Sequence, residues 1–154
     1  MFHKIRKQTE GFTIIEVLIV LAIAGLILLI VFLAVPALQR NSRNTQRRND
    51  VSALLAGVQE FQNNNNGGLP TGWTAASKQL TGGTGTVTVN LGFYQGANVS
   101  VSNAGGNVNN AGNEDSVIIA VNHGCFGNDV AAPATRRVAA LFTVEANVNQ
   151  CQNS

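Results

Sequence analysis

The chain has 154 residues, which is enough for one modest domain and one additional segment. Hydrophobic residues make up 45% of the chain and charged residues only 12%, so the composition departs from that of an ordinary soluble domain. The net charge of +2 is too small to indicate nucleic-acid binding, and two cysteines exclude a disulfide-dense scaffold and a four-cysteine zinc site. These averages therefore conceal segments of very different character.

The amino-terminal part of the chain contains a basic leader followed by an apolar stretch. Residues 1–11 carry Lys4, Arg6 and Lys7 against Glu10, and residues 17–35 are nineteen consecutive residues without a polar side chain. With a rise of about 1.5 Å per residue, a helix of that length extends about 29 Å, which matches the hydrocarbon core of a bilayer. Basic residues flank the stretch on both sides, so the positive-inside rule alone does not set its orientation. The sequence predicts one membrane-spanning helix.

Helical periodicity continues beyond the apolar stretch. Apolar residues recur at spacings of three and four, at Val51, Leu54, Leu55, Val58 and Phe61. The first strong stop signal is a run of asparagines that begins at residue 63 and leads into two glycines and a proline. We therefore expect one helix over residues 13–63, about 75 Å long. Its first half is apolar on all sides, whereas its second half is amphipathic and is expected to pack on a small domain.

From residue 69 onward the chain is rich in Gly, Asn, Thr, Ser and Val and has few charges. Alternating or β-branched runs predict four short antiparallel strands, at residues 86–91, 98–102, 116–122 and 138–144. We also expect a short helix over residues 75–80, a turn at residues 81–86 and a long exposed loop over residues 103–115. The predicted fold class is α+β, with a long amino-terminal helix packed on a small antiparallel β-sheet head.

Glu16 is the most informative anomaly, because this carboxylate immediately precedes the nineteen apolar residues. An acid within the apolar part of a membrane helix costs on the order of a few kcal/mol and tends to have a partner or a function. Two interpretations follow from the residues alone. Either Glu16 lies in the headgroup region at the start of the span, or it has a functional partner.

The string KQTEGFTIIEVLIVLAIAGL, residues 7–26, resembles the amino-terminal signature of type IV pilins. The resemblance is specific over about residues 7–38 and nearly absent in the head. It implies that a prepilin peptidase cuts the leader between Gly11 and Phe12 on the cytoplasmic side and methylates Phe12. It also matches Glu16 to the acid that the family uses for assembly, where it would neutralise the amino terminus of a neighbouring subunit in a low-dielectric bundle.

The resemblance implies an organisation in four parts. Residues 1–11 would be a cleaved leader, residues 12–38 the transmembrane and filament-core half of the helix, residues 39–66 its amphipathic half, and residues 67–154 the head. The chain would sit in the cytoplasmic membrane with its head outside and then join a helical homo-oligomer on the cell surface. Expected partners are the prepilin peptidase and the inner-membrane pilus assembly machinery, and no cofactor or metal is expected. Loss of the leader would reduce the net side-chain charge from +2 to zero.

Two helix-disfavouring residues, Gly25 and Pro36, lie within the predicted helix. In the family, a glycine and a proline bracket a region that can unwind in the filament. Gly25 matches this pattern, but Pro36 lies three residues later than the usual proline. A simple kink that aims the helix at the head is the alternative, and the sequence does not choose between them.

Several arginines follow the apolar stretch, at Arg40, Arg43, Arg47 and Arg48. We expect a solvated helix surface that faces the headgroups. In a filament these side chains could instead pair with Asp50 or Glu60 of neighbours. Binding of DNA phosphates is weakly supported, because no aromatic residues are interleaved with the arginines.

The two cysteines, Cys125 and Cys151, lie near the carboxyl end. An exported head favours a disulfide between them, and the resemblance implies such a bond, because pilins often close a carboxyl-terminal loop in this way. A catalytic pair of Cys125 and His123 lacks a further base or orienting acid, so we expect His123 in a turn.

Two further patterns are considered as a metal-binding site and a modification site. Resemblance to pseudopilins would suggest calcium at Glu114, Asp115 and Asp129, but their spacing matches no calcium-loop pattern, so solvated loop charges are expected. Asn98 begins a formal glycosylation sequon, a motif short enough to occur by chance.

The function expected from the sequence is that of a structural subunit of a type IV pilus, used for adhesion, twitching motility or DNA uptake. The alternatives are a pseudopilin of a type II secretion system or a minor pilin. A membrane-anchored binding module or enzyme is disfavoured, because the head offers no evident constellation of converging titratable groups.

Overall fold

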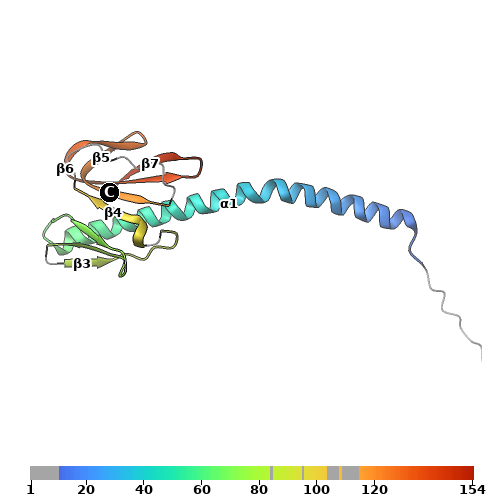
Figure 1. Ribbon diagram of the computed structural model, residues 1–154, viewed down its shortest axis with the longest axis horizontal. Helices are drawn as coiled ribbons and strands as arrows, with labels where there is room; N and C mark the ends of the chain where they lie inside the picture. Colours follow the sequence, from blue (N-terminus) through green and yellow to red (C-terminus); the bar gives the residue numbers. More distant parts are fainter. Residues whose placement is uncertain (1–10, 84, 95, 104–107, 109–114) are drawn as a thin grey trace, which may run out of the picture. The chain divides into compact units, whose positions relative to one another are not determined.

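The computed structural model describes residues 11–83, 85–94, 96–103, 108 and 115–154 (Figure 1). The chain divides into an amino-terminal unit that ends at Gln39 and a head unit, Arg40–Ser154. One long helix, α1 (Ile14–Asn64), contributes to both units and confirms the helix predicted over residues 13–63. Gly25 and Pro36 both lie inside this uninterrupted helix.

The end of α1 is formed by a carboxy-terminal cap. Asn66 and Gly67 have φ values of 53° and 80°, in the left-handed region. The Gly67 N–H donates to the carbonyl of Gln62 at 2.7 Å, which is the long hydrogen bond of a Schellman motif. The asparagine and glycine run therefore ends the helix as predicted, with an asparagine rather than a glycine as the first left-handed residue.

In the amino-terminal unit, the apolar side chains of α1 are exposed from Ile14 to Leu38. By length and composition this is the one helix among the described residues that could cross a membrane. The exposed apolar surface goes all round the helix, because neighbouring positions such as Leu28, Leu29 and Ile30 are each more than half exposed.

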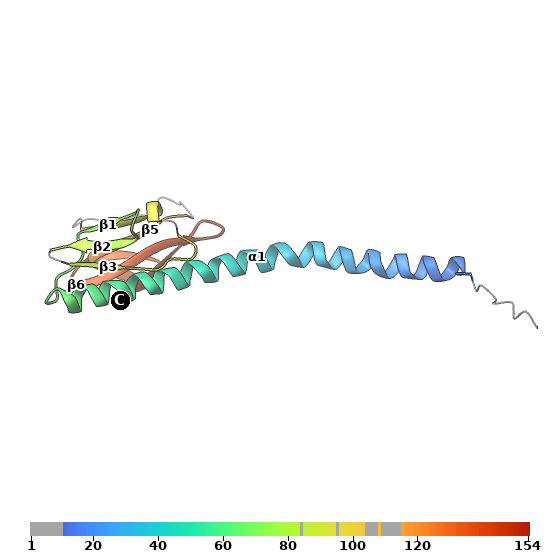
Figure 2. The same ribbon diagram turned by 90° about the horizontal axis from the view of Figure 1, so that it is seen from below.

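The head unit contains two sheets (Figures 1 and 2). The first is antiparallel, in the order β1-β2-β3, and consists of β1 (Gly72–Thr74), β2 (Gln79–Gly82) and β3 (Gly85–Thr88). The second has the order β4-β5-β6-β7 and consists of β4 (Val99–Ser102), β5 (Val117–Phe126), β6 (Asp129–Val144) and β7 (Val148–Asn153). In the second sheet β4 runs parallel to β5, and the other pairs are antiparallel. A short 3-10 helix, η1 (Gly96–Asn98), precedes β4.

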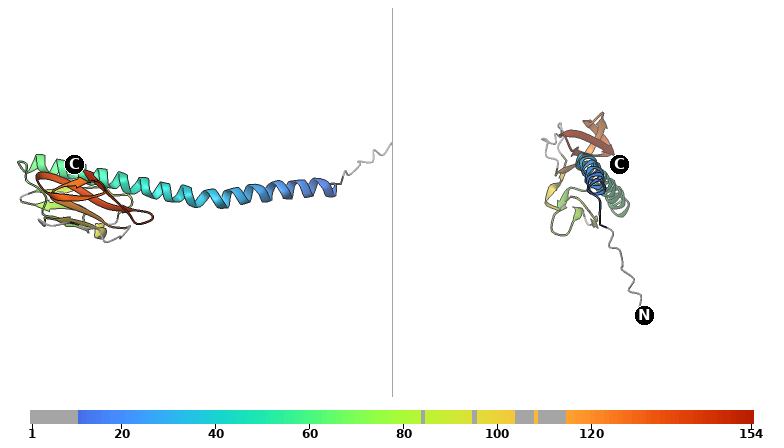
Figure 3. Two further views of the ribbon diagram at one scale, coloured as in Figure 1. Left: turned by 90° about the horizontal axis from the view of Figure 1, so that it is seen from above. Right: turned by 90° about the vertical axis from the view of Figure 1, so that its right-hand side faces the viewer.

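The core of the head lies between the sheets and one face of α1. Val51, Leu54, Val58 and Phe61 are at most 1% exposed and belong to one cluster with side chains of both sheets. Figure 3 shows the red strands of the four-stranded sheet and the green strands of the other sheet as separate layers of the head. At Gly57 the helix approaches the segment after β3 so closely that a Cβ atom would lie 2.5 Å from Val89 Cγ2.

Several details of the predicted head are wrong. The helix expected over residues 75–80 is a turn followed by β2, the strands β1 and β7 were not predicted, and β3 ends at Thr88 rather than at residue 91. The β4–β5 pair is parallel rather than antiparallel. The turn expected at residues 81–86 is shorter than predicted, because Thr81 and Gly82 belong to β2, Gly85 and Thr86 belong to β3, and Gly83 is its described turn residue. Most of the loop expected over residues 103–115 lies outside the described residues.

Candidate functional site

The amino-terminal end of α1 is built around a capping box formed by Thr13 and Glu16. Glu16 Oε2 accepts hydrogen bonds from the Thr13 backbone N–H at 2.8 Å and from the Thr13 hydroxyl at 2.6 Å. The Glu16 N–H in turn donates to Thr13 Oγ1 at 3.4 Å. This reciprocal arrangement satisfies backbone donors that the first turn of a helix otherwise leaves unpaired. In the single chain, Glu16 therefore has a local partner.

The candidate cleavage bond lies just before this cap. Gly11 and Phe12 are exposed and outside the helix, and the Phe12 side chain is 90% exposed. No described atom lies near the position of a Cβ on Gly11. This bond therefore lies outside the helix between two exposed residues, where a protease can reach it.

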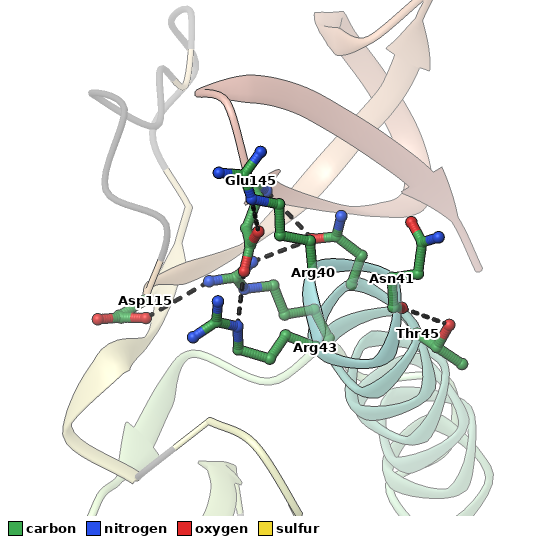
Figure 4. Close-up of polar contacts among 8 residues, drawn as sticks. Arg40, Asn41, Arg43, Thr45, Asp115 and Glu145 are labelled. Atoms are coloured by element: carbon green, nitrogen blue, oxygen red, sulfur yellow. Dashed lines mark hydrogen bonds and ion pairs between the residues drawn. The ribbon is translucent and has the colours of Figure 1, made fainter. Parts of the chain in front are cut away.

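A groove in the head unit brings together most of the arginines that follow the apolar stretch (Figure 4). Its volume is about 850 Å³, and its lining includes Arg40, Arg43, Arg47, Asp115 and Glu145. We call it the arginine groove. Figure 4 shows Arg40 and Arg43 extending from α1 toward Glu145, which lies in the turn between β6 and β7.

Glu145 binds the two arginines at the rim of the arginine groove unequally. Its Oε1 lies 2.6 Å from Arg43 Nε, whereas its Oε2 lies 3.7 Å from Arg40 Nε. The Glu145 side chain is 14% exposed, and its backbone N–H donates to Asn44 Oδ1 at 3.1 Å. Ala146 has a φ of 72°, so the tight turn that presents Glu145 to α1 uses left-handed backbone.

Arg47 lies deeper in the arginine groove than Arg40 and Arg43. Its burial shows that the expectation of a wholly solvated arginine surface is wrong for this residue. Its side chain is 3% exposed, and its guanidinium lies 4.6 Å from the centre of the Phe93 ring, a cation–π contact. Nη1 donates to Asn44 Oδ1 at 3.0 Å, and Nη2 lies 3.7 Å from Asp115 Oδ1. Arg47 therefore joins α1 to the head. The prediction failed because spacing from the membrane says nothing about which helix face the head covers.

Asp50, which we considered as an ion-pair partner for a neighbouring subunit, is used inside the head. Its carboxylate accepts hydrogen bonds from the backbone N–H groups of Gly92, Phe93 and Tyr94, at 2.9, 2.7 and 2.8 Å. The residue is 6% exposed. A carboxylate that is buried and triply hydrogen-bonded is not available to another subunit, so that interpretation is wrong for Asp50. Glu60 is exposed on the same helix.

Arg48 lies on a different side of α1 from the arginine groove. Its Nε donates to Gln150 Oε1 at 3.2 Å, and one turn further along the helix Ser52 Oγ accepts a hydrogen bond from Gln152 Nε2 at 3.3 Å. These bonds join β7 to α1.

Cys125 and Cys151 form a disulfide that links β5 to β7, as expected from the resemblance. His123 is not in a turn: it lies in β5, is 1% exposed, and its Nδ1 donates to the Val121 carbonyl at 2.8 Å. The β5–β6 register shifts on either side of His123, so the strand continues through a bulge there.

Among the described residues, no group of three or more His, Cys, Asp or Glu side chains could hold a metal ion. Asp115 faces Arg47, Asp129 begins β6, and Glu114 lies outside the described residues. The sequon residue Asn98 is the last residue of η1 and is half-buried.

Tyr94 is a further buried residue with a polar group, and it belongs to the loop that Asp50 holds. Its hydroxyl is buried and has no hydrogen-bond partner among the described residues. Burial raises the pKa of this hydroxyl above its ordinary value of 10.0, because the phenolate would lose its hydration.

Sequence reasoning missed Thr13, Asn44, Phe93 and Glu145. Thr13 could have been found, because Thr-Ile-Ile-Glu before an apolar run is the capping-box pattern. The other three act through contacts between segments far apart in sequence, for which the chain carries no local signal.

Comparison with protein families agrees with the geometry at the amino terminus. The family model described as the prokaryotic N-terminal methylation motif matches residues 6–32. This motif is the class III signal peptide of type IV pilins, so the match supports a type IV pilin-like or pseudopilin precursor. Together with the apolar helix, the motif fits membrane anchoring before assembly. Such a motif implies processing by a prepilin peptidase. No curated protein and no solved structure matched the chain.

Proposed function

We propose that this chain is a type IV pilin: a precursor cut between Gly11 and Phe12, methylated at Phe12, and polymerised through its apolar helix into a surface filament. The observation that carries the proposal is the methylation motif at residues 6–32, which leads directly into a helix whose apolar side chains are exposed on all sides. Such a surface needs lipid or other subunits around it. The same surface would serve first as membrane anchor and then as filament interior.

Glu16 would act at the assembly step. After cleavage, the new amino group of Phe12 is a cation that must enter an apolar bundle, and Glu16 of a neighbouring subunit would neutralise it. The capping box supplies a competing explanation, in which Glu16 only stabilises the first turn of α1. Two substitutions separate these roles, because the cap and the charge depend on different atoms.

Glu16→Gln keeps an oxygen that can accept the Thr13 bonds but removes the charge, whereas Thr13→Ala removes the two bonds of the Thr13 hydroxyl and keeps the charge. We expect cells that express Glu16→Gln to process the subunit normally and to lose nearly all filaments. Thr13→Ala should retain most filaments. Measurement of subunit in the membrane and in sheared surface fractions tests this. Normal filament yield from Glu16→Gln, or equal loss from both variants, would contradict the assembly role.

Mass spectrometry of the mature amino terminus tests the processing step. The expected product begins with N-methylated Phe12. An intact Met1 or a cut at another bond would refute the proposal. The same assembly chemistry serves pseudopilins and minor pilins, and abundance distinguishes them, since a major pilin should dominate the sheared filament fraction.

A further inference from the structure

The arginine groove contains more positive than negative charge. Three guanidinium groups, those of Arg40, Arg43 and Arg47, face two carboxylates, those of Glu145 and Asp115. The described lining therefore has a net charge of about +1, and a ligand with one negative charge would neutralise it. A phosphodiester is such a ligand, and the planar donor fork of arginine matches phosphate oxygens.

The geometry leaves donors available at the rim. The 3.7 Å separation between Arg40 Nε and Glu145 exceeds hydrogen-bond length, and Arg40 and Arg43 side chains are 69% and 54% exposed. Each guanidinium has five N–H donors, more than the single carboxylate of Glu145 can engage. Arg47, held against Phe93, provides a fixed charge beneath these two adjustable side chains.

The position of the groove in the chain identifies the source of the phosphate. Arg40 follows Leu38, the last of the exposed large apolar residues of the span, by only two residues. Phospholipid headgroups lie immediately outside the hydrocarbon core. We infer that the arginine groove binds the phosphate of a phospholipid on the side of the membrane that carries the head. This inference rests on the proposed membrane-anchored state, and the bound lipid would fix the head at the membrane surface before assembly.

The test uses the full chain in a neutral detergent, with bound lipid counted by native mass spectrometry. Short-chain phosphatidylglycerol and phosphatidylcholine are the phosphate-bearing probes, diacylglycerol is the probe without phosphate, and inorganic phosphate is the free anion. The double variant Arg40→Gln with Arg43→Gln should bind the phospholipids about 25-fold more weakly, at about fivefold per arginine. Arg48→Gln is the matched control, since Arg48 contacts Gln150 outside the groove, and it should bind like the parent chain.

Glu145→Gln is expected to change the affinity for phospholipid in the opposite direction. A variant that fails to fold would not bind the lipid more tightly, so this result is separate from loss of folding. Because Glu145 competes with phosphate for the same guanidinium groups, its neutralisation should tighten phospholipid binding about fivefold. A purely structural role for the cluster predicts no tightening. The fluorescence of Trp73 in the head reports whether each variant is folded.

Several outcomes would overturn the inference. Equal weakening by Arg48→Gln, unchanged binding in the double variant, or no tightening with Glu145→Gln would each do so. Saturation by inorganic phosphate with no gain from the lipid would show a free-anion site instead. Unchanged lipid binding together with lost filaments in the double variant would assign the groove to a carboxylate of a second copy, such as Glu60. The lipid-binding measurements do not depend on the amino-terminal processing that tests the proposed function.

Discussion

Asp50 is the side chain whose removal should most damage the head. It is buried on α1 and holds three consecutive backbone N–H groups of the loop after β3, at 2.7–2.9 Å. Asp50→Ala leaves these donors without their acceptor, and the N–H of Tyr94 is in a buried residue where water cannot replace it easily. The loop and the contact between Arg47 and Phe93 should loosen together.

The expected loss follows from the number and kind of these bonds. A hydrogen bond to a charged group contributes about 1.5–3 kcal/mol, and three bonds that share one carboxylate are not additive. We therefore expect Asp50→Ala to lower the free energy of unfolding by about 3–5 kcal/mol. Domains have only about 5–15 kcal/mol in total. Asp50→Asn should cost about 2–3 kcal/mol, because one carboxylate oxygen becomes an NH₂ donor that faces other donors.

Trp73 provides the assay, because it is the only tryptophan and its indole Nε1 donates to the Gly96 carbonyl at 2.6 Å, near the affected loop. Urea unfolding of the full chain in micelles, followed by its fluorescence, gives the change in free energy. Glu60→Ala, an exposed acid on the same helix, is the control and should stay within about 0.5 kcal/mol of the parent. A loss below about 1 kcal/mol for Asp50→Ala would refute the reasoning.

Three other changes test the packing of the head. Tyr94→Phe removes a buried hydroxyl without a hydrogen-bond partner among the described residues and should stabilise the head by about 1 kcal/mol in urea unfolding. In the parent chain, the raised pKa of Tyr94 contributes stability that is fully present below about pH 10 and is lost as the pH rises toward the folded-state pKa. Absorbance of the tyrosinate should therefore appear only when the head unfolds at alkaline pH. Gly57→Ala should destabilise the head by about 1–3 kcal/mol, because its Cβ would lie 2.5 Å from Val89 Cγ2. Replacement of Cys125 and Cys151 by serine should cost about 3.5 kcal/mol, given their separation of 26 residues.

Each of these has a control. Tyr94 is the chain's only tyrosine, so its phenylalanine variant should show no tyrosinate signal at all. For Gly57, the control is Ala56→Gly at the exposed neighbouring position, which should lower the free energy of unfolding by about 1 kcal/mol through helix propensity alone. A higher free energy of unfolding for Gly57→Ala would contradict the prediction, because it would show that the Val89 side chain moves aside at little cost. Reduction of the parent protein should reproduce the cysteine variants, and unchanged stability after reduction would contradict the estimate.

The long helix was predictable because its evidence is local and periodic. The apolar run, the three- and four-residue spacing beyond it, and the asparagine and glycine stop all lie within α1 or directly after it. The strands were harder. β7, with the sequence VNQCQN, is mostly polar because it is an edge strand that is only half-buried, so it shows no apolar alternation.

β6 was predicted at less than half its length for a related reason. Its first part contains Pro133, Arg136 and Arg137, which argue against a strand in isolation. In the structure, Pro133 pairs with His123 where the β5–β6 register shifts, and Arg136 takes a φ of 62° with its N–H donating to Asn122 Oδ1. An irregular ladder therefore accommodates residues that a regular strand would exclude.

The acids of this chain show what decides whether a site can be predicted. The partner of Glu16 within the chain is three residues away, so the cap is written in the sequence as Thr-Ile-Ile-Glu. Asp50 bonds to groups more than forty residues away, and Glu145 pairs with arginines about a hundred residues away. Their roles depend on how sheets and helix meet, which periodicity does not encode. The proposed partner of Glu16 in assembly belongs to another chain. Within a single chain, the same carboxylate already has a role as part of the capping box with Thr13. Separation of charge from capping by Glu16→Gln and Thr13→Ala is therefore the decisive comparison.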